Sequence, residues 1–176
     1  MSYCAYILQG GTDEAYQLHK LYHDTQYGVP IADDDELFGR LLLEINQAGL
    51  SWTTILKKQD HFRRAYSGFS IAAVAAYTEA DRQRLLQDAG IIRNRLKVDA
   101  AIYNAQVILQ LQQSHGSFKK WLEAHHPQDK AAWVKLFKKH FRFTGGEIVN
   151  EFLMSTGYLP GAHTEGCPLY RQASAL

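Results

Sequence analysis

The sequence is poor in cysteine and has no long apolar run. Its two cysteines, Cys4 and Cys167, are too few for a disulfide scaffold and are typical of a reducing cytoplasm. No apolar stretch approaches the roughly 18 to 20 residues that cross a bilayer. The N-terminal residues also lack the basic-then-apolar pattern of a secretion signal. We therefore expect a cytoplasmic protein with no membrane association.

The sequence also lacks a net charge that would by itself indicate a nucleic-acid partner, because its formal charge is +1. Apolar residues make up 46% and charged residues 21%, which indicates a folded chain. The charge is uneven: residues 1–50 carry two basic and eight acidic side chains, whereas residues 51–176 carry 17 basic and 10 acidic ones. The basic part can bind a polyanion, although ordinary surface scatter explains the same distribution.

Sustained period-two alternation, internal repeats and low-complexity linkers are absent from the sequence, which disfavours sheet and repeat folds. Apolar residues instead recur at helical spacing. We predict an all-α fold in a single domain of residues 1–176, with eight or nine short helices and an irregular tail from Tyr158. The helices that the pattern delimits cover residues 33–49, 51–66, 70–76, 78–90, 94–114, 117–126, 130–139 and 146–156.

A very short turn, Leu86–Asn94, joins two of these predicted helices. Gly90 permits a positive φ there, and an apolar residue can then tuck between the helices. The second helix would begin with free backbone N–H groups, which can hold a DNA phosphate. Basic side chains lie beside that helix start: Arg93, Arg95 and Lys97. An ordinary αα-hairpin with a glycine cap is the alternative.

Glu44 interrupts an apolar helix face, because it follows Leu41 by three positions and Leu37 by seven. A carboxylate in such a setting is costly unless it is paired or faces a cavity. If it faces a cavity it can bind a cation or accept a proton; otherwise it is a boundary residue that reaches solvent. Rings in the N-terminal segments would complete a pocket for a flat cationic ligand, unless they belong to the core: Tyr6, Tyr22, Tyr27 and Trp52.

Residues near the two chain ends form a candidate metal-binding set: Cys4, His23, His163 and Cys167. Two sulfurs with two imidazoles suit a closed structural zinc site. A zinc-dependent hydrolase is disfavoured, because four protein ligands leave no coordination position for water. On spacing alone, free thiols and surface histidines remain the alternative.

Several motifs occur in a fixed order along nearly the whole chain. The most specific are E-x-x-Q-A-G-L-S-W from Glu44 and Q-D-x-G-I-I-R from Gln87. Further stretches are Tyr22–Asp24, Tyr27–Pro30, Leu37–Phe38, Thr54–Lys58, Phe141–Gly145, Phe152–Met154 and His163–Cys167. In this order the motifs resemble those of the DNA-3-methyladenine glycosylase I family of Tag type.

The resemblance implies an all-α helix-hairpin-helix glycosylase fold, with the hairpin at about residues 79–114 and an added zinc-binding part from residues 1–30 and 158–170. The four cysteine and histidine residues would hold a structural Zn²⁺ ion. Glu44 would be the catalytic carboxylate that recognises the methylated adenine. Aromatic residues would line the base pocket, namely Tyr22, Trp52, Tyr6 and Tyr27. Backbone groups would bind DNA at Gly90, Ile91, Ile92 and Arg93.

The resemblance further implies a base-excision-repair enzyme, expected to be a monomer, that acts on double-stranded DNA containing alkylated bases. N3-methylation makes adenine a cationic leaving group, so hydrolysis needs little acid catalysis. Superfamily members that act on neutral bases use an Asp, often with a Lys, after the hairpin. Residues 108–113 contain neither, which favours a monofunctional hydrolase without lyase activity.

The chain departs from the family pattern around the expected pocket. The segment from Cys4 to His23 is several residues longer than usual, and Ala5-Tyr6 replaces a Gly-Trp pair. An aromatic residue is replaced by His19, a Glu-Trp pair by Gln26-Tyr27, and a tyrosine by Asn150. These changes leave the preferred base open. They motivate an alternative function, a non-catalytic module of the same fold that binds damaged DNA.

Overall fold

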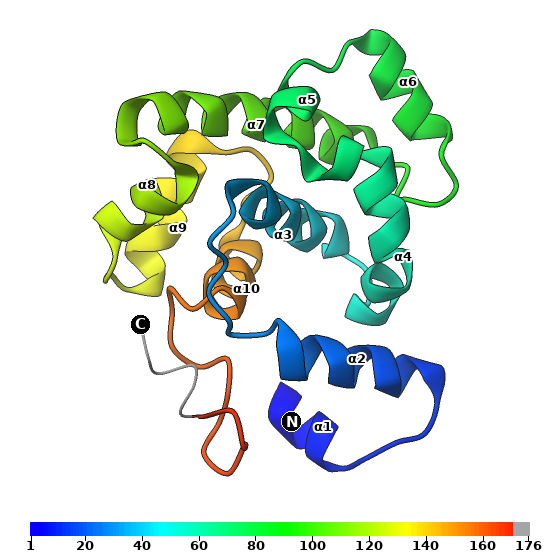
Figure 1. Ribbon diagram of the computed structural model, residues 1–176, viewed down its shortest axis with the longest axis vertical. Coiled ribbons are helices and arrows are strands. Elements are labelled where there is room, and N and C mark those ends of the chain that lie inside the picture. The colour runs from blue at the N-terminus through cyan, green and yellow to red at the C-terminus, as the bar shows by residue number, and fades with distance from the viewer. Residues whose placement is uncertain (171–176) are drawn as a thin grey trace.

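The computed structural model describes residues 1–170, and helices are the regular elements of that part of the chain (Figure 1). This confirms the predicted all-α class. Besides the short 3-10 turn Ser67–Phe69, the helices are α1 (Tyr3–Leu8), α2 (Glu14–Thr25), α3 (Asp34–Gln47), α4 (Trp52–Ala65), α5 (Ile71–Ala75), α6 (Glu79–Gln87), α7 (Arg95–His115), α8 (Phe118–His125), α9 (Lys130–His140) and α10 (Gly146–Ser155).

The described residues thus contain ten α-helices, more than the eight or nine predicted. The helices from α3 onward lie where the spacing predicted them, within a few residues at each end. The sequence pattern predicted no specific helix over the residues that form α1 and α2. Helix α1 has only six residues, and α2 buries tyrosine and histidine rings, which a hydropathy pattern does not count as apolar.

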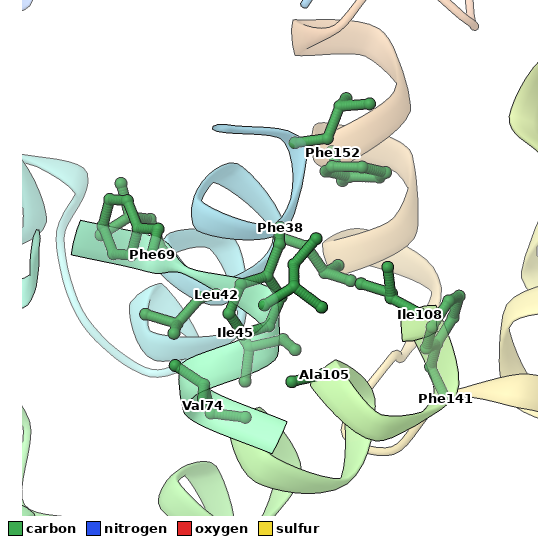
Figure 2. Packing of buried hydrophobic residues seen from close by; sticks show 14 of the residues in the cluster. Phe38, Leu42, Ile45, Phe69, Val74, Ala105, Ile108, Phe141 and Phe152 are labelled. Atoms are coloured by element: carbon green, nitrogen blue, oxygen red, sulfur yellow. The ribbon is translucent and has the colours of Figure 1, made fainter. Parts of the chain in front are cut away.

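Helix α3 lies at the centre of the molecule, and other helices surround it (Figure 1). All residues from Leu37 to Asn46 are buried. Gly39 lets the ring of Phe69 pack directly on the α3 backbone, because a Cβ atom there would overlap that ring. Figure 2 shows α3 side chains together with apolar side chains of α5, α7 and α10, among them Val74, Ile108 and Phe152.

Two consecutive aspartates at the start of α3, Asp33 and Asp34, accept hydrogen bonds from the N-termini of two different helices. The Asp33 side chain caps α3 by accepting the Glu36 N–H. The carboxylate of Asp34 instead accepts the backbone N–H groups of Phe118 and Lys119 at the start of α8, at 2.8 and 3.0 Å. The acidic run therefore stabilises two helix N-termini.

Helices α1 and α2 and the C-terminal segment lie together, on the far side of α3 from α5 and α7 (Figure 1). Residues 158–169 form turns and bends, as predicted for the irregular tail from Tyr158. The last part of that predicted tail, residues 171–176, lies outside the described residues. Across residues 1–170, no helix is both long and apolar enough to cross a bilayer.

Candidate functional site

A cavity of about 830 Å³ opens between α1, α2, α3, α4, α10 and the C-terminal segment. This volume is within the range of small-molecule sites. Both polar and aromatic side chains line it. The lining residues are Ser2, Tyr3, Tyr6, His19, Tyr22, Tyr27, Glu44, Gln47, Trp52, Thr53, Glu147, Glu151, Met154, Gly161, Ala162 and Thr164.

Glu44 faces this cavity from the last turn of α3, and only 4% of its surface is exposed. No donor of residues 1–170 lies within hydrogen-bonding distance of its carboxylate. Burial raises the pKa of Glu44 to about 8, an effect that Arg40 partly opposes and Glu151 reinforces. The alternative of a boundary residue reaching solvent is therefore wrong.

Arg40 lies one helical turn before Glu44 and is also buried. Its guanidinium lies over the Tyr22 ring, 5.1 Å from the ring centre, and donates to the backbone carbonyl of Ser155 at 3.4 Å. No ion pair forms between Arg40 and Glu44, so the arginine moderates the charge of the carboxylate without occupying its oxygens.

The four aromatic residues named from the sequence, Tyr6, Tyr22, Tyr27 and Trp52, all line the cavity. The rings of Tyr22 and Trp52 meet edge to face, with centres 5.2 Å apart. The indole Nε1 of Trp52 is buried and donates no hydrogen bond within the described chain. An aromatic wall with one free carboxylate can therefore hold a flat polar ligand.

Sequence reasoning did not identify several other lining residues, including Tyr3, Thr53, Glu147 and Glu151. His19, which stands in place of an aromatic residue of the family, is also in the wall. Its Nδ1 lies 2.9 Å from the Tyr3 hydroxyl and its Nε2 lies 2.7 Å from the Thr53 hydroxyl. Burial lowers the pKa of His19, so this chain of hydrogen bonds contains a neutral imidazole.

The four residues proposed as metal ligands meet at one buried point beside the cavity. Their ligand atoms all lie within 4.8 Å of one another. Cys4 Sγ is 3.4 Å from His23 Nε2 and 3.5 Å from His163 Nδ1. Cys167 Sγ is 3.8 and 3.6 Å from the same two nitrogens. The set can hold a metal ion, and the alternative of surface histidines is wrong because all four side chains are buried.

The remaining ring nitrogens of both histidines have partners outside the cluster. His23 Nδ1 lies 2.8 Å from an Asp24 carboxylate oxygen, and His163 Nε2 donates to the Tyr27 carbonyl at 2.8 Å. Such contacts fix ring orientation and direct the free nitrogen to one point. The cluster therefore connects α1, α2 and the C-terminal segment.

The turn between α6 and α7 differs from the sequence prediction in two respects. Gly90 is not among the glycines with positive φ. Space is tight there instead, because a Cβ atom would lie 2.8 Å from Nδ1 of the exposed His61 side chain, which would have to shift. Lys97 does not flank an anion site: it is buried, and its Nζ donates to the carbonyls of Asn46 and Ala48 at the end of α3.

Other features of the turn fit an anion site. The Gly90 N–H donates to the Asp88 side chain, and the Ile91 N–H lies 3.4 Å from the Asp88 carbonyl. The N–H groups of Ile92 and Arg93 donate to no acceptor in residues 1–170. Arg93 is exposed. The turn therefore presents two free backbone donors beside one cation.

Comparisons with known proteins agree on one family. A family model described as methyladenine glycosylase matches residues 12–134. The chain is 38% identical to DNA-3-methyladenine glycosylase 1 of Escherichia coli strain K12, over 87% of this chain and 91% of the relative. It is 32% identical to DNA-3-methyladenine glycosylase of Haemophilus influenzae, over 84% of this chain and 89% of the relative.

Solved structures are similar over nearly the whole chain. One is a variant of 3-methyladenine DNA glycosylase I in complex with 3-methyladenine, with a TM-score of 0.81 and 33% identity over 96% of this chain and 97% of the other. Another is a structure of 3-methyladenine DNA glycosylase I from Staphylococcus aureus that concerns the recognition of 3-methyladenine. Its TM-score is 0.81, with 32% identity over 95% of this chain and 97% of the other.

Proposed function

This chain belongs to the methyladenine glycosylase family, and on that premise we propose that it hydrolyses the N-glycosidic bond of 3-methyladenine in alkylated DNA. The observation that carries the proposal is Glu44, a buried carboxylate without a partner in an aromatic cavity. A cationic methylated purine supplies what this carboxylate lacks, a positive charge and hydrogen-bond donors. The aromatic wall suits its flat faces.

In the proposed reaction the damaged nucleotide leaves the helix and its base enters the cavity. The bond between C1′ and N9 breaks, and its electron pair neutralises the cationic base. The oxygen of a water molecule adds to C1′, and its released proton passes to solvent. Glu44 favours the methylated base over normal adenine by its charge. The aromatic residues Tyr22, Trp52, Tyr6 and Tyr27 orient the base.

We propose that the enzyme is monofunctional. Strand cleavage by a lyase begins with attack of an amine on C1′, and none of the described residues that line the cavity is a lysine. The nearby buried lysine, Lys97, uses its Nζ on two backbone carbonyls. Hydrolysis by water alone is therefore the chemistry that these residues support.

For DNA binding we propose the turn Gly90, Ile91, Ile92 and Arg93. The free N–H groups of Ile92 and Arg93 would bind a backbone phosphate, with the Arg93 side chain beside it. Phosphate contacts position a duplex without reading its sequence. The turn would thus hold double-stranded DNA while the cavity selects the base.

We propose that Cys4, His23, His163 and Cys167 hold a structural zinc ion. The donor set fits: tetrahedral zinc separates sulfur and nitrogen ligands by about 3.5 Å, and the four sulfur–nitrogen distances are 3.4 to 3.8 Å. When bound, zinc would cross-link the two chain ends and take no part in hydrolysis, because its four positions are filled.

We also propose that the enzyme is a monomer, because the residues of one chain complete both the base cavity and the metal-ligand set. A cytoplasmic location is supported by the two cysteines, which form no disulfide.

Release of free 3-methyladenine from methylated duplex DNA tests the proposed function directly. We expect the purified protein to release this base and to leave an intact sugar–phosphate strand at the abasic site. Tight binding of methylated DNA without release would instead support the non-catalytic damage-binding alternative. Release accompanied by strand cleavage would contradict the monofunctional mechanism.

A further inference from the structure

The cavity contains a second carboxylate without a hydrogen-bond partner, Glu151 of α10. Its side chain is half-buried and lines the cavity. No donor of the described residues binds it. The nearby cation Lys130 donates instead to Glu147, one turn earlier on α10, at 3.0 Å.

Glu151 and Glu44 line the same cavity, Glu44 from α3 and Glu151 from α10. The rings of Tyr22 and Tyr27 line this cavity as well. Glu151 also raises the pKa of Glu44 itself. The two acids therefore belong to one site, in which Glu44 is almost completely buried and has no partner.

Two carboxylates that line one cavity disfavour each other's ionisation. A ligand with a fixed positive charge relieves that repulsion and lets both groups ionise. A neutral ligand of the same shape leaves the repulsion and the desolvation cost in place. Discrimination between such ligands thus depends on the number of carboxylates around the ring.

We propose that Glu151 is a specificity-determining residue, which acts with Glu44 to admit purines carrying a fixed positive charge in preference to neutral bases. The proposal rests on the function proposed above and concerns how that site separates a cationic base from a neutral one. Glu44 meets the purine from α3, and Glu151 supplies the second negative charge from α10.

The test uses the intact protein and two small probes. The first probe, 3,9-dimethyladeninium, has a permanent positive charge, and the second, 9-methyladenine, is its neutral counterpart. Isothermal titration calorimetry gives a dissociation constant for each probe. We expect wild type to bind the cation more tightly. In Glu151→Gln, the ratio of the two affinities should fall by about threefold to tenfold, through weaker binding of the cation alone.

Glu123→Gln is the control for loss of a surface carboxylate. Glu123 lies on α8, is not among the residues that line the cavity, and pairs through its exposed side chain with Lys119. Its neutralisation should leave the ratio unchanged. The proposal is overturned if wild type does not prefer the cation, if Glu151→Gln keeps the wild-type ratio, or if Glu123→Gln lowers the ratio equally.

The probe experiment is independent of base excision. Excision of 3-methyladenine by wild type, together with an unchanged ratio in Glu151→Gln, would reject the role of Glu151 and retain the proposed function. Probe discrimination that depends on Glu151, without any excision from DNA, would reject the enzyme and retain the cation site. Thermal unfolding of each variant shows whether a changed ratio reflects a damaged fold.

Discussion

The metal cluster and the cavity are adjacent, but they differ in whether their polar atoms have hydrogen-bond partners. In the cluster, the outer nitrogens of His23 and His163 both have partners, and the inner atoms face one another. In the cavity, the carboxylate of Glu44 and the indole N–H of Trp52 have none in residues 1–170. A closed set of polar groups is typical of a structural site, whereas an open set indicates a site that receives a ligand.

The two regions share α2, because Tyr22 of the cavity and His23 of the cluster are adjacent in sequence. Tyr27, whose carbonyl accepts from His163, also lines the cavity. The cluster therefore holds one wall of the cavity against α3 and α4. If this comparison is right, damage to the cluster should reduce stability first, and damage to the cavity should reduce chemistry first.

The largest effect should follow loss of the cluster. Cys4→Ser removes a thiolate ligand, and we expect the melting temperature to fall by about 10 °C or more, because structural metal binding contributes several kcal/mol to folding. Elemental analysis should find one zinc per chain in wild type and none in the variant. Thermal unfolding measures the loss.

His115→Ala serves as the control for the cluster, since His115 is an exposed histidine on α7. It should change neither metal content nor melting temperature appreciably. Freshly purified wild type without bound metal, or a Cys4→Ser variant as stable as wild type, would contradict a structural metal site and remove one half of the comparison.

The next largest effect should follow neutralisation of Glu44. Glu44→Gln keeps the shape of the side chain but removes its charge and one acceptor. A hydrogen bond with a charged partner is worth about 1.5–3 kcal/mol, so excision of 3-methyladenine should slow by about tenfold to a hundredfold. Single-turnover release from methylated duplex measures the rate, and binding of undamaged duplex serves as the control.

Duplex binding should barely change in Glu44→Gln, because the proposed phosphate contacts lie at Ile92 and Arg93. A variant with the wild-type excision rate would exclude Glu44 from the mechanism. A variant that loses duplex binding and excision together would show that Glu44 supports the fold rather than the chemistry.

The turn between α6 and α7 extends the comparison, since it too presents unpartnered donors. In Gly90→Ala, the added Cβ would press on His61 Nδ1 and displace the free N–H groups. We expect affinity for any duplex to fall by about tenfold, equivalent to about 1.4 kcal/mol. Fluorescence anisotropy with two unrelated duplexes measures it.

His61→Ala combined with Gly90→Ala should restore much of this affinity, because it removes the atom that the methyl group meets. His61→Ala alone should have a small effect. Equal binding by Gly90→Ala and wild type would mean that the turn does not grip phosphate. Failure of the double variant to recover would point to the Asp88 side chain, which lies 3.0 Å from the added Cβ.

The sequence predicted those parts of the site whose residue type conflicts with their surroundings. Glu44 was identified because a carboxylate on an apolar helix face is costly unless it is paired or faces a cavity. The structure places it in the cavity without a partner. The metal cluster was a candidate set because sulfur and imidazole ligands are few in the chain, and the structure brings all four together. In both cases the type of residue was enough to identify the site without its three-dimensional arrangement.

Residues without such a conflict were missed. Glu151 lies on a partly exposed helix, where a glutamate is unremarkable until α10 is packed against α3. Tyr3 precedes the first expected helix and looks like any N-terminal aromatic. Lys97 appeared to belong to a basic surface, but tertiary packing turned it inward onto carbonyls of α3. Local pattern does not encode such inter-helix placement.

The smallest effect concerns the stability cost of leaving Glu44 unpartnered. Its pKa rises from 4.5 in the unfolded chain to about 8 in the folded protein, so the folded state binds more protons between these values. Stability therefore falls as the pH rises from about 4.5 to 8, and the full cost applies above pH 8.

Glu44→Gln lacks this cost. The whole change in pKa corresponds to at most about 5 kcal/mol, but the cavity opens to solvent, which hydrates the carboxylate and reduces the cost. We therefore expect the variant to be more stable than wild type at pH 9 by about 1 kcal/mol, or about 2–4 °C in melting temperature, and equally stable near pH 4.5. The difference between variants at each pH cancels the titration of the metal ligands, which both proteins share. Thermal unfolding across this range measures it, and a pH-independent difference would mean that the carboxylate has a partner in solution and that the cavity is closed in the same sense as the metal cluster.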